Sequence, residues 1–288
     1  MGVSSRLVKS NDPTPKKRLG QHFLRDKGVI DRIVRWIQPA ADDLFVEIGA
    51  GDGSLSVRLA PRVACFIAIE VDADCIPLLK NNLADFKYAK VLEGDILKLD
   101  LRELVLSHLQ KGQALRLAGN LPYNISTAII EKGFESGLPV KDMSFMVQQE
   151  VAQRITAQPG SRQYGYLSVY CQHRSEVRRG LKISPACFVP RPQVYSSMVS
   201  FNPKSDPLNP DFESNFEALA KAAFAYRRKT LENSLRRHPV IGQFAHDLLD
   251  QAAIDGSRRA EQLSVQEYEN LAHVFHNHFR ASADLRKL

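Results

Sequence analysis

The chain of 288 residues is 44% hydrophobic and 25% charged, the ordinary balance of a globular protein with an apolar core. No apolar run reaches the roughly 18 residues that a membrane-spanning helix needs, and no apolar stretch follows the basic start, so we expect neither a membrane protein nor a secretory signal. The formal net charge of +7 permits an anionic partner but does not by itself establish one.

Positive charge is concentrated in two segments. Residues 1–27 carry seven basic and two acidic side chains, and residues 171–192 carry five basic and one acidic. We expect residues 1–18 to form a flexible basic tail. The cysteines form no CxxC pair, so we expect free thiols in a reducing cytoplasm and no metal site. They are Cys65, Cys75, Cys171 and Cys187.

From residue 27 onwards, helical and strand patterns alternate. Ile30, Ile33, Val34 and Ile37 recur at helical spacing and predict a helix over 27–37. Alternation of strands with helices predicts an α/β fold with a mainly parallel, Rossmann-like sheet, in which ligands bind beyond the carboxyl ends of the strands. The apolar runs predict strands at 44–48, 64–69, 115–118 and 143–147, and helices are expected at about 54–60, 73–84, 101–110 and 126–135.

A Pro- and Asn-rich stretch at 202–210 then indicates a linker, and the rest of the chain reads as helical. One helix is predicted over 212–237 and a second over about 240–253. A capping box from Ser264 to Glu267 predicts the start of a third. We therefore expect a first domain over residues 19–204 and a smaller all-helical domain over residues 205–288.

The first strand is followed by the glycine-rich segment EIGAGDG at 47–53. Gly49 and Gly51 permit a tight turn and a close approach of the backbone to a ligand. The third glycine of the dinucleotide fingerprint would fall at Ser54, which counts against a loop that holds a pyrophosphate. A tight turn with a purely structural role remains the alternative for this segment alone.

Two acidic residues follow the next strands of the predicted sheet. Glu70 ends the second strand, where a carboxylate can accept hydrogen bonds from both hydroxyls of a ribose. Asp95 lies just after a further strand, the third along the chain, between the runs at 64–69 and 115–118, and there it could meet an adenine amino group. Each alone is more often a solvated carboxylate or a helix cap. Together with the glycine loop, they favour a site for S-adenosylmethionine.

After the fourth strand comes Asn120-Leu121-Pro122-Tyr123. The exocyclic amine of adenine is a poor nucleophile because its lone pair is delocalised into the ring. Two hydrogen-bond acceptors for its N–H groups favour the pyramidal form of the amine, in which the lone pair is free to attack a methyl group. Asn120 offers a side-chain carbonyl for this, and Leu121 or Pro122 offers a backbone carbonyl. Tyr123 would stack on a base flipped out of its helix. A simple turn between strand and helix is the alternative for these four residues alone.

With its other motifs, the chain resembles the KsgA family of ribosomal RNA small-subunit adenine dimethyltransferases over nearly its whole length. The pattern FxPxPxVxS from Phe188 to Ser196 and the RRKTL segment make the combination specific. The remaining matching segments are KKRLGQHFL (16–24), EIGAGDG (47–53), GD (94–95), NLPYNIS (120–126), QQEVAQRI (148–155), PGSRQYGYLSV (159–169) and RRKTLENSLR (227–236). The chain departs from the commoner family pattern at His22, Ala50, Asp52 and Ala128.

The resemblance implies that two methyl groups pass from S-adenosylmethionine to N6 of each of two adjacent adenosines. The target would be the loop of the 3′-terminal hairpin of 16S rRNA in an assembling 30S particle. In the adenine pocket, Phe188 would be a second stacking surface opposite Tyr123, beside Asn120, Leu121 and Pro122. The cofactor-binding residues implied by the matching positions are Gln21, His22, Leu24, Gly49, Gly51, Glu70, Asp95 and Asn120.

Basic side chains beyond the pocket are the expected contacts to RNA phosphate. A charge run is usually a solvated face, and the resemblance is what favours an RNA role for the run at 227–229. His273, His276 and His278 lack a cysteine or carboxylate that would complete a metal site. We expect a monomer. The predicted RNA-binding residues are Arg174, Arg178, Arg179, Arg191, Arg227, Arg228 and Lys229.

Two alternative functions remain at this point. The first is a ribosome-assembly or RNA-binding factor in which catalysis is secondary, although the intact Glu70, Asp95 and Asn120–Tyr123 set argues against a loss of catalysis. The second is an N6-adenine methyltransferase that acts on DNA or on large-subunit rRNA. The helical domain with RRKTL and the FxPxP segment argue against it.

Overall fold

The computed structural model describes residues 13–204 and 209–285, and the chain forms two compact units. The first unit comprises the chain up to Gln149 together with Gly180–Ser200, and the second comprises Glu150–Arg179 together with the chain from Phe201 onwards. Residues 1–12 of the predicted tail lie outside the described residues. The division into domains over 19–204 and 205–288 stays a prediction.

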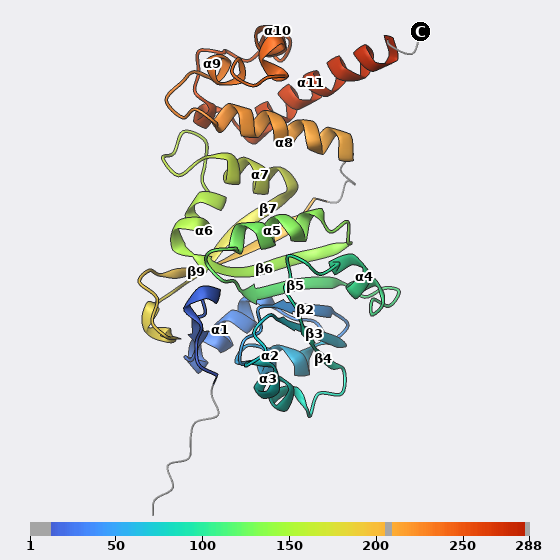
Figure 1. Cartoon of the computed structure of the whole chain (residues 1–288), viewed down its shortest axis with the longest axis vertical. Helices are drawn as coiled ribbons and strands as arrows, with labels where there is room; N and C mark the ends of the chain where they lie inside the picture. Colours follow the sequence, from blue (N-terminus) through green and yellow to red (C-terminus); the bar gives the residue numbers. More distant parts are fainter. Residues whose placement is uncertain (1–12, 205–208, 286–288) are drawn as a thin grey trace, which may run out of the picture. The chain divides into compact units, whose positions relative to one another are not determined.

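The first unit is built on a parallel sheet. Strands β4 (Ala89–Glu93), β3 (Cys65–Glu70), β2 (Leu44–Ile48), β5 (Leu115–Asn120) and β6 (Val140–Gln148) pair in this order, each parallel to the next. In the described chain the sheet continues through β9 (Ser196–Pro203) to β7 (Ser175–Ile183), two strands that the sequence patterns did not predict. The four predicted strands are confirmed to within a few residues (Figure 1).

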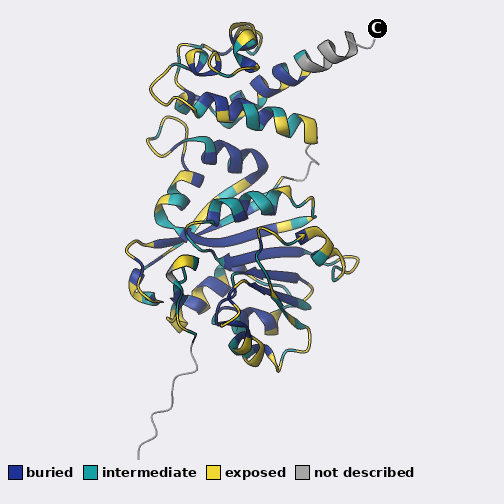
Figure 2. Ribbon diagram, viewed as in Figure 1, coloured by how far each residue is buried: buried dark blue, intermediate teal, exposed yellow. Residues whose placement is uncertain are grey.

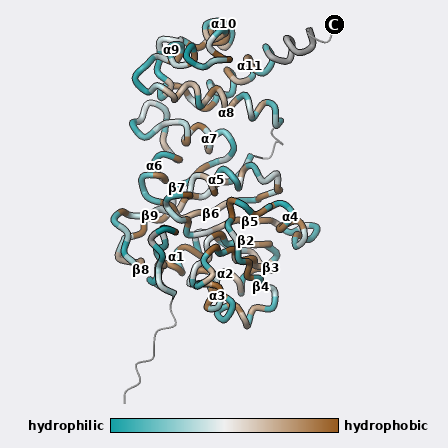
Figure 3. The backbone as a smooth tube through the Cα atoms, in the orientation of Figure 1, coloured by the Kyte–Doolittle hydropathy of each residue, from teal (hydrophilic) through white to brown (hydrophobic). Residues whose placement is uncertain are grey.

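The central strands are buried because their sequences are apolar on both faces. All five residues of β2 are buried, which is typical of a parallel strand covered on its two faces (Figure 2). The hydropathy of the chain shows the same strands as its most apolar part (Figure 3). The carboxyl ends of β2, β3 and β5 therefore lie at the edge of a buried layer.

Short helices connect these strands. Helix α1 (Lys27–Ile37) has the predicted bounds, and its four periodic residues are the buried ones. It begins at Asp26, whose side chain accepts a hydrogen bond from the backbone N–H of Val29. A two-stranded antiparallel ribbon joins β1 (Phe23–Leu24) to β8 (Phe188–Val189). The other elements are η1 (Lys17–Leu19), α2 (Ser56–Leu59), η2 (Ala60–Arg62), α3 (Ile76–Leu83), α4 (Leu101–Leu106), α5 (Ser126–Glu135) and η3 (Pro185–Cys187).

The second unit is mainly helical and has its own apolar core. The predicted capping box is confirmed: Ser264 Oγ accepts from the backbone N–H of Glu267, and the Glu267 carboxylate accepts from the Ser264 N–H at 2.7 Å. No helix in the described part of the chain is both long and apolar enough to cross a membrane. The elements are α6 (Gln149–Ile155), α7 (Tyr166–Arg174), α8 (Pro210–Phe224), α9 (Leu231–Leu235), η4 (Ile241–Phe244), α10 (Ala245–Gln251), η5 (Ala260–Gln262) and α11 (Val265–Leu285).

The single helix predicted over 212–237 is wrong, because the chain forms α8 and α9 with turns between them. Thr230 caps α9 by accepting a hydrogen bond from the Asn233 N–H. The N–H of Leu231 donates to the carbonyl of Arg258 at 2.7 Å. These contacts turn the backbone out of the helix although the apolar spacing continues through it.

Candidate active site

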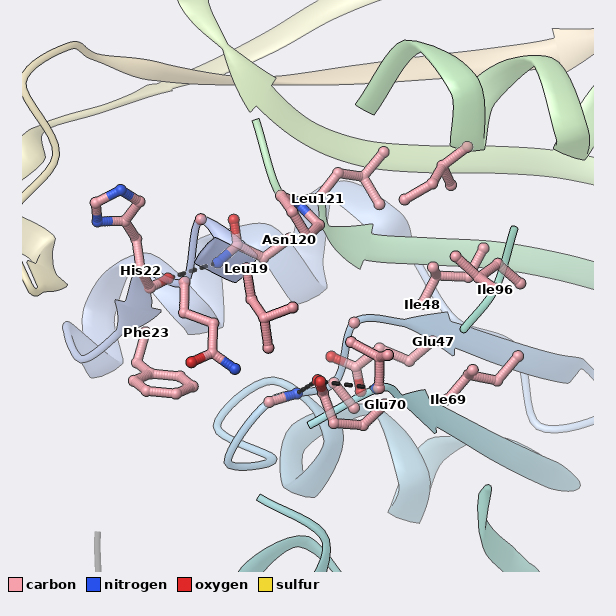
Figure 4. A pocket seen from close by; sticks show the side chains of 18 of the residues that line it. Leu19, His22, Phe23, Glu47, Ile48, Ile69, Glu70, Ile96, Asn120 and Leu121 are labelled. Carbon is pink, nitrogen blue, oxygen red and sulfur yellow. Dashed lines mark hydrogen bonds between the residues drawn. The ribbon is translucent and has the colours of Figure 1, made fainter. Parts of the chain in front are cut away.

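A pocket in the first unit opens at the carboxyl ends of the parallel strands, and segments from β2, β3 and β5 line it (Figure 4). The empty space in it is about 960 Å³ when the open solvent at its mouth is included. The lining residues are 19–24, 47–52, 54–55, 69–71, 94–96 and 120–123, with Ile125, Ile129 and Met146. This is the edge at which the sequence predicted a ligand site.

The glycine loop approaches the pocket with a backbone that only glycine adopts readily. Gly49 and Gly51 have φ angles of +71° and +58°, in the left-handed region. A Cβ on Gly51 would lie 3.0 Å from the ring of Phe23, which packs against the loop. The loop therefore needs glycine both for its conformation and for the space at this position.

Glu70 is held by backbone N–H groups at the end of β3. Its Oε2 accepts from the N–H of Gly51 at 2.6 Å, and its Oε1 accepts from those of Val71 and Asp72 at 2.9 and 2.8 Å. Burial raises the pKa of this carboxyl, although the three N–H donors oppose the shift. A carboxylate has about four acceptor positions, so Oε2 keeps capacity for a ligand hydroxyl.

Asp95 lies at the pocket edge with a partly exposed side chain. Its Oδ1 accepts from the N–H of Leu97 at 3.0 Å, and its Oδ2 lies 3.8 Å from the Nζ of Lys98. The neighbouring Ile96 is buried and lines the pocket with Val71. Apolar side chains beside a carboxylate suit a flat base with an amino group, and the contact of Asp95 with adenine stays a prediction.

The Asn120 amide has a defined orientation. Its Nδ2 donates to the main-chain carbonyl of His22 at 2.9 Å, as the dashed line in Figure 4 shows. The next residue, Leu121, is fixed by its N–H, which donates to the Met146 carbonyl at 3.1 Å. With Nδ2 engaged in this way, the Oδ1 atom of Asn120 is the acceptor that the side chain can offer a ligand amine.

The Tyr123 ring is held at its hydroxyl and over one face. The hydroxyl shares a hydrogen bond of 2.7 Å with Oγ of Ser196, and the His22 imidazole is stacked on the ring with centroids 5.3 Å apart. The Nδ1 of His22 donates to the carbonyl of Pro190 at 2.7 Å. Burial raises the pKa of Tyr123. Ser196 was read as the end of a motif and not as a site residue, because its contact depends on the tertiary fold.

Phe188, the predicted second stacking surface, lies in the β1–β8 ribbon. It is 3% exposed, packs in the apolar core of the first unit and pairs with Leu24 in the β1–β8 ribbon. The residues that line the pocket include Leu24 and Tyr123 but not Phe188. A stacking role for Phe188 would require the ribbon to move, and it stays a prediction.

Gln21 lines the pocket but its amide is engaged. Its Nε2 donates to Asp72 at 2.7 Å, and its Oε1 accepts from the N–H of Lys16 at 2.7 Å. The Lys16 ammonium also pairs with Asp72. Burial disfavours the charged form of Asp72, but the hydrogen bonds from Lys16 and Gln21 outweigh it and lower the pKa. Gln21 therefore fixes the N-terminal segment, and a direct cofactor contact stays a prediction.

Among the predicted RNA-binding residues, Arg174 differs from the others. It is 6% exposed, with Nη2 2.7 Å from Glu213 and the guanidinium 3.9 Å from the Tyr170 ring centroid. A buried, paired guanidinium is not available to an RNA phosphate, so we remove Arg174 from the predicted RNA surface. The exposed members are Arg178, Arg179, Arg191, Arg227, Arg228 and Lys229.

The histidines of α11 contact other side chains of the second unit. The His273 ring lies against Phe212 in a tilted arrangement with ring centroids 4.4 Å apart, and Nδ1 of His276 accepts from the Asn215 amide at 3.0 Å. In the described residues no group of histidine, cysteine and carboxylate side chains has the arrangement of a metal site. None of the four cysteines forms a disulfide in the described structure.

The pocket residues fit S-adenosylmethionine. Glu70 and Asp95 offer acceptors to a ribose and to an adenine amine, and the glycine loop leaves no Cβ in the way. The lining also includes the carboxylate of Asp52. Acidic walls favour a cofactor with a positive sulfur and disfavour a pyrophosphate.

Comparison with known proteins agrees with this site. A family model described as ribosomal RNA adenine dimethylase matches residues 13–277. A Methylococcus capsulatus protein named ribosomal RNA small subunit methyltransferase A is 40% identical over 258 residues, which cover 90% of this chain and 96% of that protein. A protein of the same name from Saccharophagus degradans is 39% identical over 271 residues, 92% of this chain and 98% of the relative.

Two solved structures show the same fold. A dimethyladenosine transferase from Plasmodium falciparum superposes with a TM-score of 0.74 at 25% identity, over 87% of this chain and 96% of that one. The 23S rRNA methyltransferase ErmE gives a TM-score of 0.66 at 22% identity, over 88% and 98% of the two chains. The resemblance seen in the motifs is confirmed, and the chain belongs to the ribosomal RNA adenine dimethylase family of S-adenosylmethionine-dependent methyltransferases.

Proposed function

We propose that the protein transfers methyl groups from S-adenosylmethionine to N6 of two adjacent adenosines in small-subunit (16S) rRNA, giving N6,N6-dimethyladenosines. The target is the loop of the 3′-terminal hairpin in an assembling 30S particle, and the protein acts as a monomer in the cytoplasm. The relatives at 39 and 40% identity carry a small-subunit name, which supports this substrate over large-subunit rRNA.

The observation that carries the proposal is the position of Asn120. Its amide is oriented by the His22 carbonyl, and it lines one pocket with Glu70, Asp95 and Tyr123. The pocket therefore combines a hydrogen-bond acceptor for an amine at Asn120 with acceptors for a cofactor at Glu70 and Asp95 and an aromatic surface for a base at Tyr123. This arrangement suits methyl transfer to an exocyclic amine better than it suits RNA binding alone.

When bound, S-adenosylmethionine supplies the methyl group from its positively charged sulfur. Asn120 Oδ1 and a backbone carbonyl at Leu121 or Pro122 accept hydrogen bonds from the two N–H groups of the adenine amine. These contacts localise the lone pair on the nitrogen. Tyr123 stacks on the flipped base and so fixes the amine near the cofactor side of the pocket. The amine loses its proton to solvent after the transfer, so no side chain is needed as a general base.

The test is to incubate the protein with labelled S-adenosylmethionine and small ribosomal subunits that lack the modification, then digest the rRNA. We expect labelled dimethyladenosine from one pair of adjacent positions. Large subunits and duplex DNA serve as matched controls and should remain unlabelled. Cofactor binding without label on small subunits would overturn the proposal and leave an assembly factor, whereas label on a control would identify a different substrate.

A further inference from the structure

An ion pair joins two of the segments that line the pocket, the N-terminal segment and the glycine loop. Arg25 directly follows β1, and Asp52 lies between Gly51 and Gly53 in the glycine loop. The guanidinium of Arg25 pairs with the Asp52 carboxylate, and their side chains are 35% and 5% exposed. Asp52 is a departure from the commoner family pattern and Arg25 lies just outside the matching segment 16–24, and neither takes part in the transfer step itself.

Asp52 is fixed within its loop. Its Oδ1 accepts from the N–H of Ser54 at 3.0 Å and from the Ser54 hydroxyl at 2.7 Å. Its main-chain carbonyl accepts from Nδ2 of Asn82 at 2.8 Å. The carboxylate that meets Arg25 is therefore held in a single place relative to the glycine loop.

Arg25 is fixed on its own side. Its N–H donates to the carbonyl of Cys187 at 2.8 Å, and its guanidinium lies 5.5 Å from the centroid of the Phe23 ring. The same ring packs on Gly51, where a Cβ would be 3.0 Å away. The contacts thus form a closed ring of four residues, which we call the clasp: Phe23, Arg25, Gly51 and Asp52.

The clasp connects two walls of one pocket, since residues 19–24 and residues 49–52 both line it. A ligand that contacts both walls binds more tightly when the walls are already held at their bound separation, because less conformational freedom is lost on binding. A charged hydrogen bond with one partner buried is strong enough to hold them.

We infer that Arg25 and Asp52 are positioning residues that set the affinity for S-adenosylmethionine by holding the N-terminal segment against the glycine loop. Arg25 acts through Asp52 and does not line the pocket itself. The inference concerns cofactor binding alone, so its test needs no RNA and its outcome is independent of the proposed substrate.

The experiment is a double-mutant cycle measured on the full chain by calorimetric titration with S-adenosylhomocysteine. We expect Arg25→Gln and Asp52→Asn each to weaken binding about 10-fold, and the double variant to be no weaker than either single one. Arg25→Lys should retain most of the affinity, because the lysine ammonium keeps the positive charge that pairs with Asp52. The matched control is the exposed pair of Arg58 and Asp31, 3.6 Å apart, whose neutralisation should leave the affinity unchanged.

Three results would overturn the inference. The first is additive losses in the double variant, which would mean that the two residues act separately. The second is an unchanged affinity in the single variants, with or without a lower Tm. The third is a loss in Arg25→Lys as large as that in Arg25→Gln. Near-ultraviolet circular dichroism checks that each variant is folded, and Arg25→Lys keeps the test decisive if the neutral variants do not fold.

Discussion

Two buried ionisable side chains, one in each unit, are held in different ways. In the second unit His173 lies between two carboxylates, with Nε2 2.8 Å from Glu213 and Nδ1 2.8 Å from Glu269. In the first unit Glu70 is held by backbone N–H groups and keeps an acceptor position open to the pocket. Side chains paired with one another stabilise a fold, whereas a carboxylate held by the backbone beside a pocket is available to a ligand.

The protonation of His173 follows from its contacts. Both of its ring nitrogens face carboxylates, so both must donate and the ring must be an imidazolium. Burial lowers the pKa of His173, but the hydrogen bonds to Glu213 and Glu269 outweigh it and raise the pKa above its usual value. Arg174 adds a further cation to Glu213, which explains why this arginine serves the fold.

The largest expected effect is that of Asn120→Ala. Removal of the carbonyl that grips the amine should lower the rate of methyl transfer about 1,000-fold, because the lost contact is strongest in the transition state. Single-turnover transfer to small subunits measures this rate. Binding to the subunits should stay nearly intact, and an equal loss of binding and transfer would show that Asn120 serves folding instead.

The next effect is on stability in the second unit. His173→Leu should lower the free energy of unfolding by about 1–3 kcal/mol, because it takes one cation from Glu213 and Glu269 and leaves only Arg174 and Lys204 beside them. Chemical denaturation measures this loss. His173 has a raised pKa in the fold, so its contribution is complete below its unfolded pKa of about 6.5 and disappears as the pH rises through the folded value.

Its pH dependence provides the control. The wild-type Tm should decline as the pH rises above about 6.5, and His173→Leu should lack this part of the decline. A variant with the same pH profile as the wild type would contradict the assignment of an imidazolium. Affinity for S-adenosylhomocysteine should be unaffected, since His173 belongs to the second unit.

A smaller effect is expected at Tyr123 and Ser196. Tyr123→Phe and Ser196→Ala should each lower kcat/KM for the rRNA about 5-fold, because the ring loses the hydrogen bond at its hydroxyl. The two changes together should cost no more than one. Ser197→Ala is the matched control and should leave kcat/KM unchanged, since its Oγ donates to the Leu181 carbonyl at 3.2 Å and not to Tyr123. Independent losses at the two positions would refute the positioning role.

The smallest effect concerns Glu47, which receives a hydrogen bond from Ser56. Burial raises the pKa of Glu47 to about 8, so its stabilising contribution is complete below its unfolded pKa and is lost as the pH rises through about 8. Glu47→Gln removes the titration. From about pH 5 to about pH 8 the wild-type Tm should therefore decline a few degrees more than that of the variant.

The exposed Glu93, at the end of β4, provides the comparison for Glu47. Glu93→Gln should leave the pH profile of the Tm unchanged. If Glu47→Gln and wild type gave parallel profiles, Glu47 would be ionised in the fold and our account of its burial would be incorrect.

Local patterns were sufficient for much of the fold. The bounds of α1 follow from the spacing of its apolar residues and from Asp26 at its start. Strands β2, β3, β5 and β6 contain the predicted apolar runs, and Glu70, Asp95 and Asn120 follow from their position at strand ends. These features depend on short stretches of sequence, so the sequence predicts them.

The errors arise where distant segments decide the structure. The break before α9 depends on Leu231 binding the carbonyl of Arg258, and the burial of Arg174 depends on Glu213. The contacts of Tyr123 with Ser196 and of Arg25 with Asp52 likewise join residues from separate parts of the chain. Charge and spacing carry no record of such partners, so an arginine that is buried reads like one that is exposed.

The most direct test of this difference between the units replaces one carboxylate by its amide in each unit. For both variants the affinity for S-adenosylhomocysteine and the Tm are measured. Asp95→Asn keeps an acceptor for Leu97 but turns an N–H group towards the adenine amine, so affinity for S-adenosylhomocysteine should weaken about 10-fold or more at an unchanged Tm. Glu269→Gln should lower the Tm by several degrees at an unchanged affinity. An affinity loss in Glu269→Gln, or a Tm loss without an affinity loss in Asp95→Asn, would contradict the account.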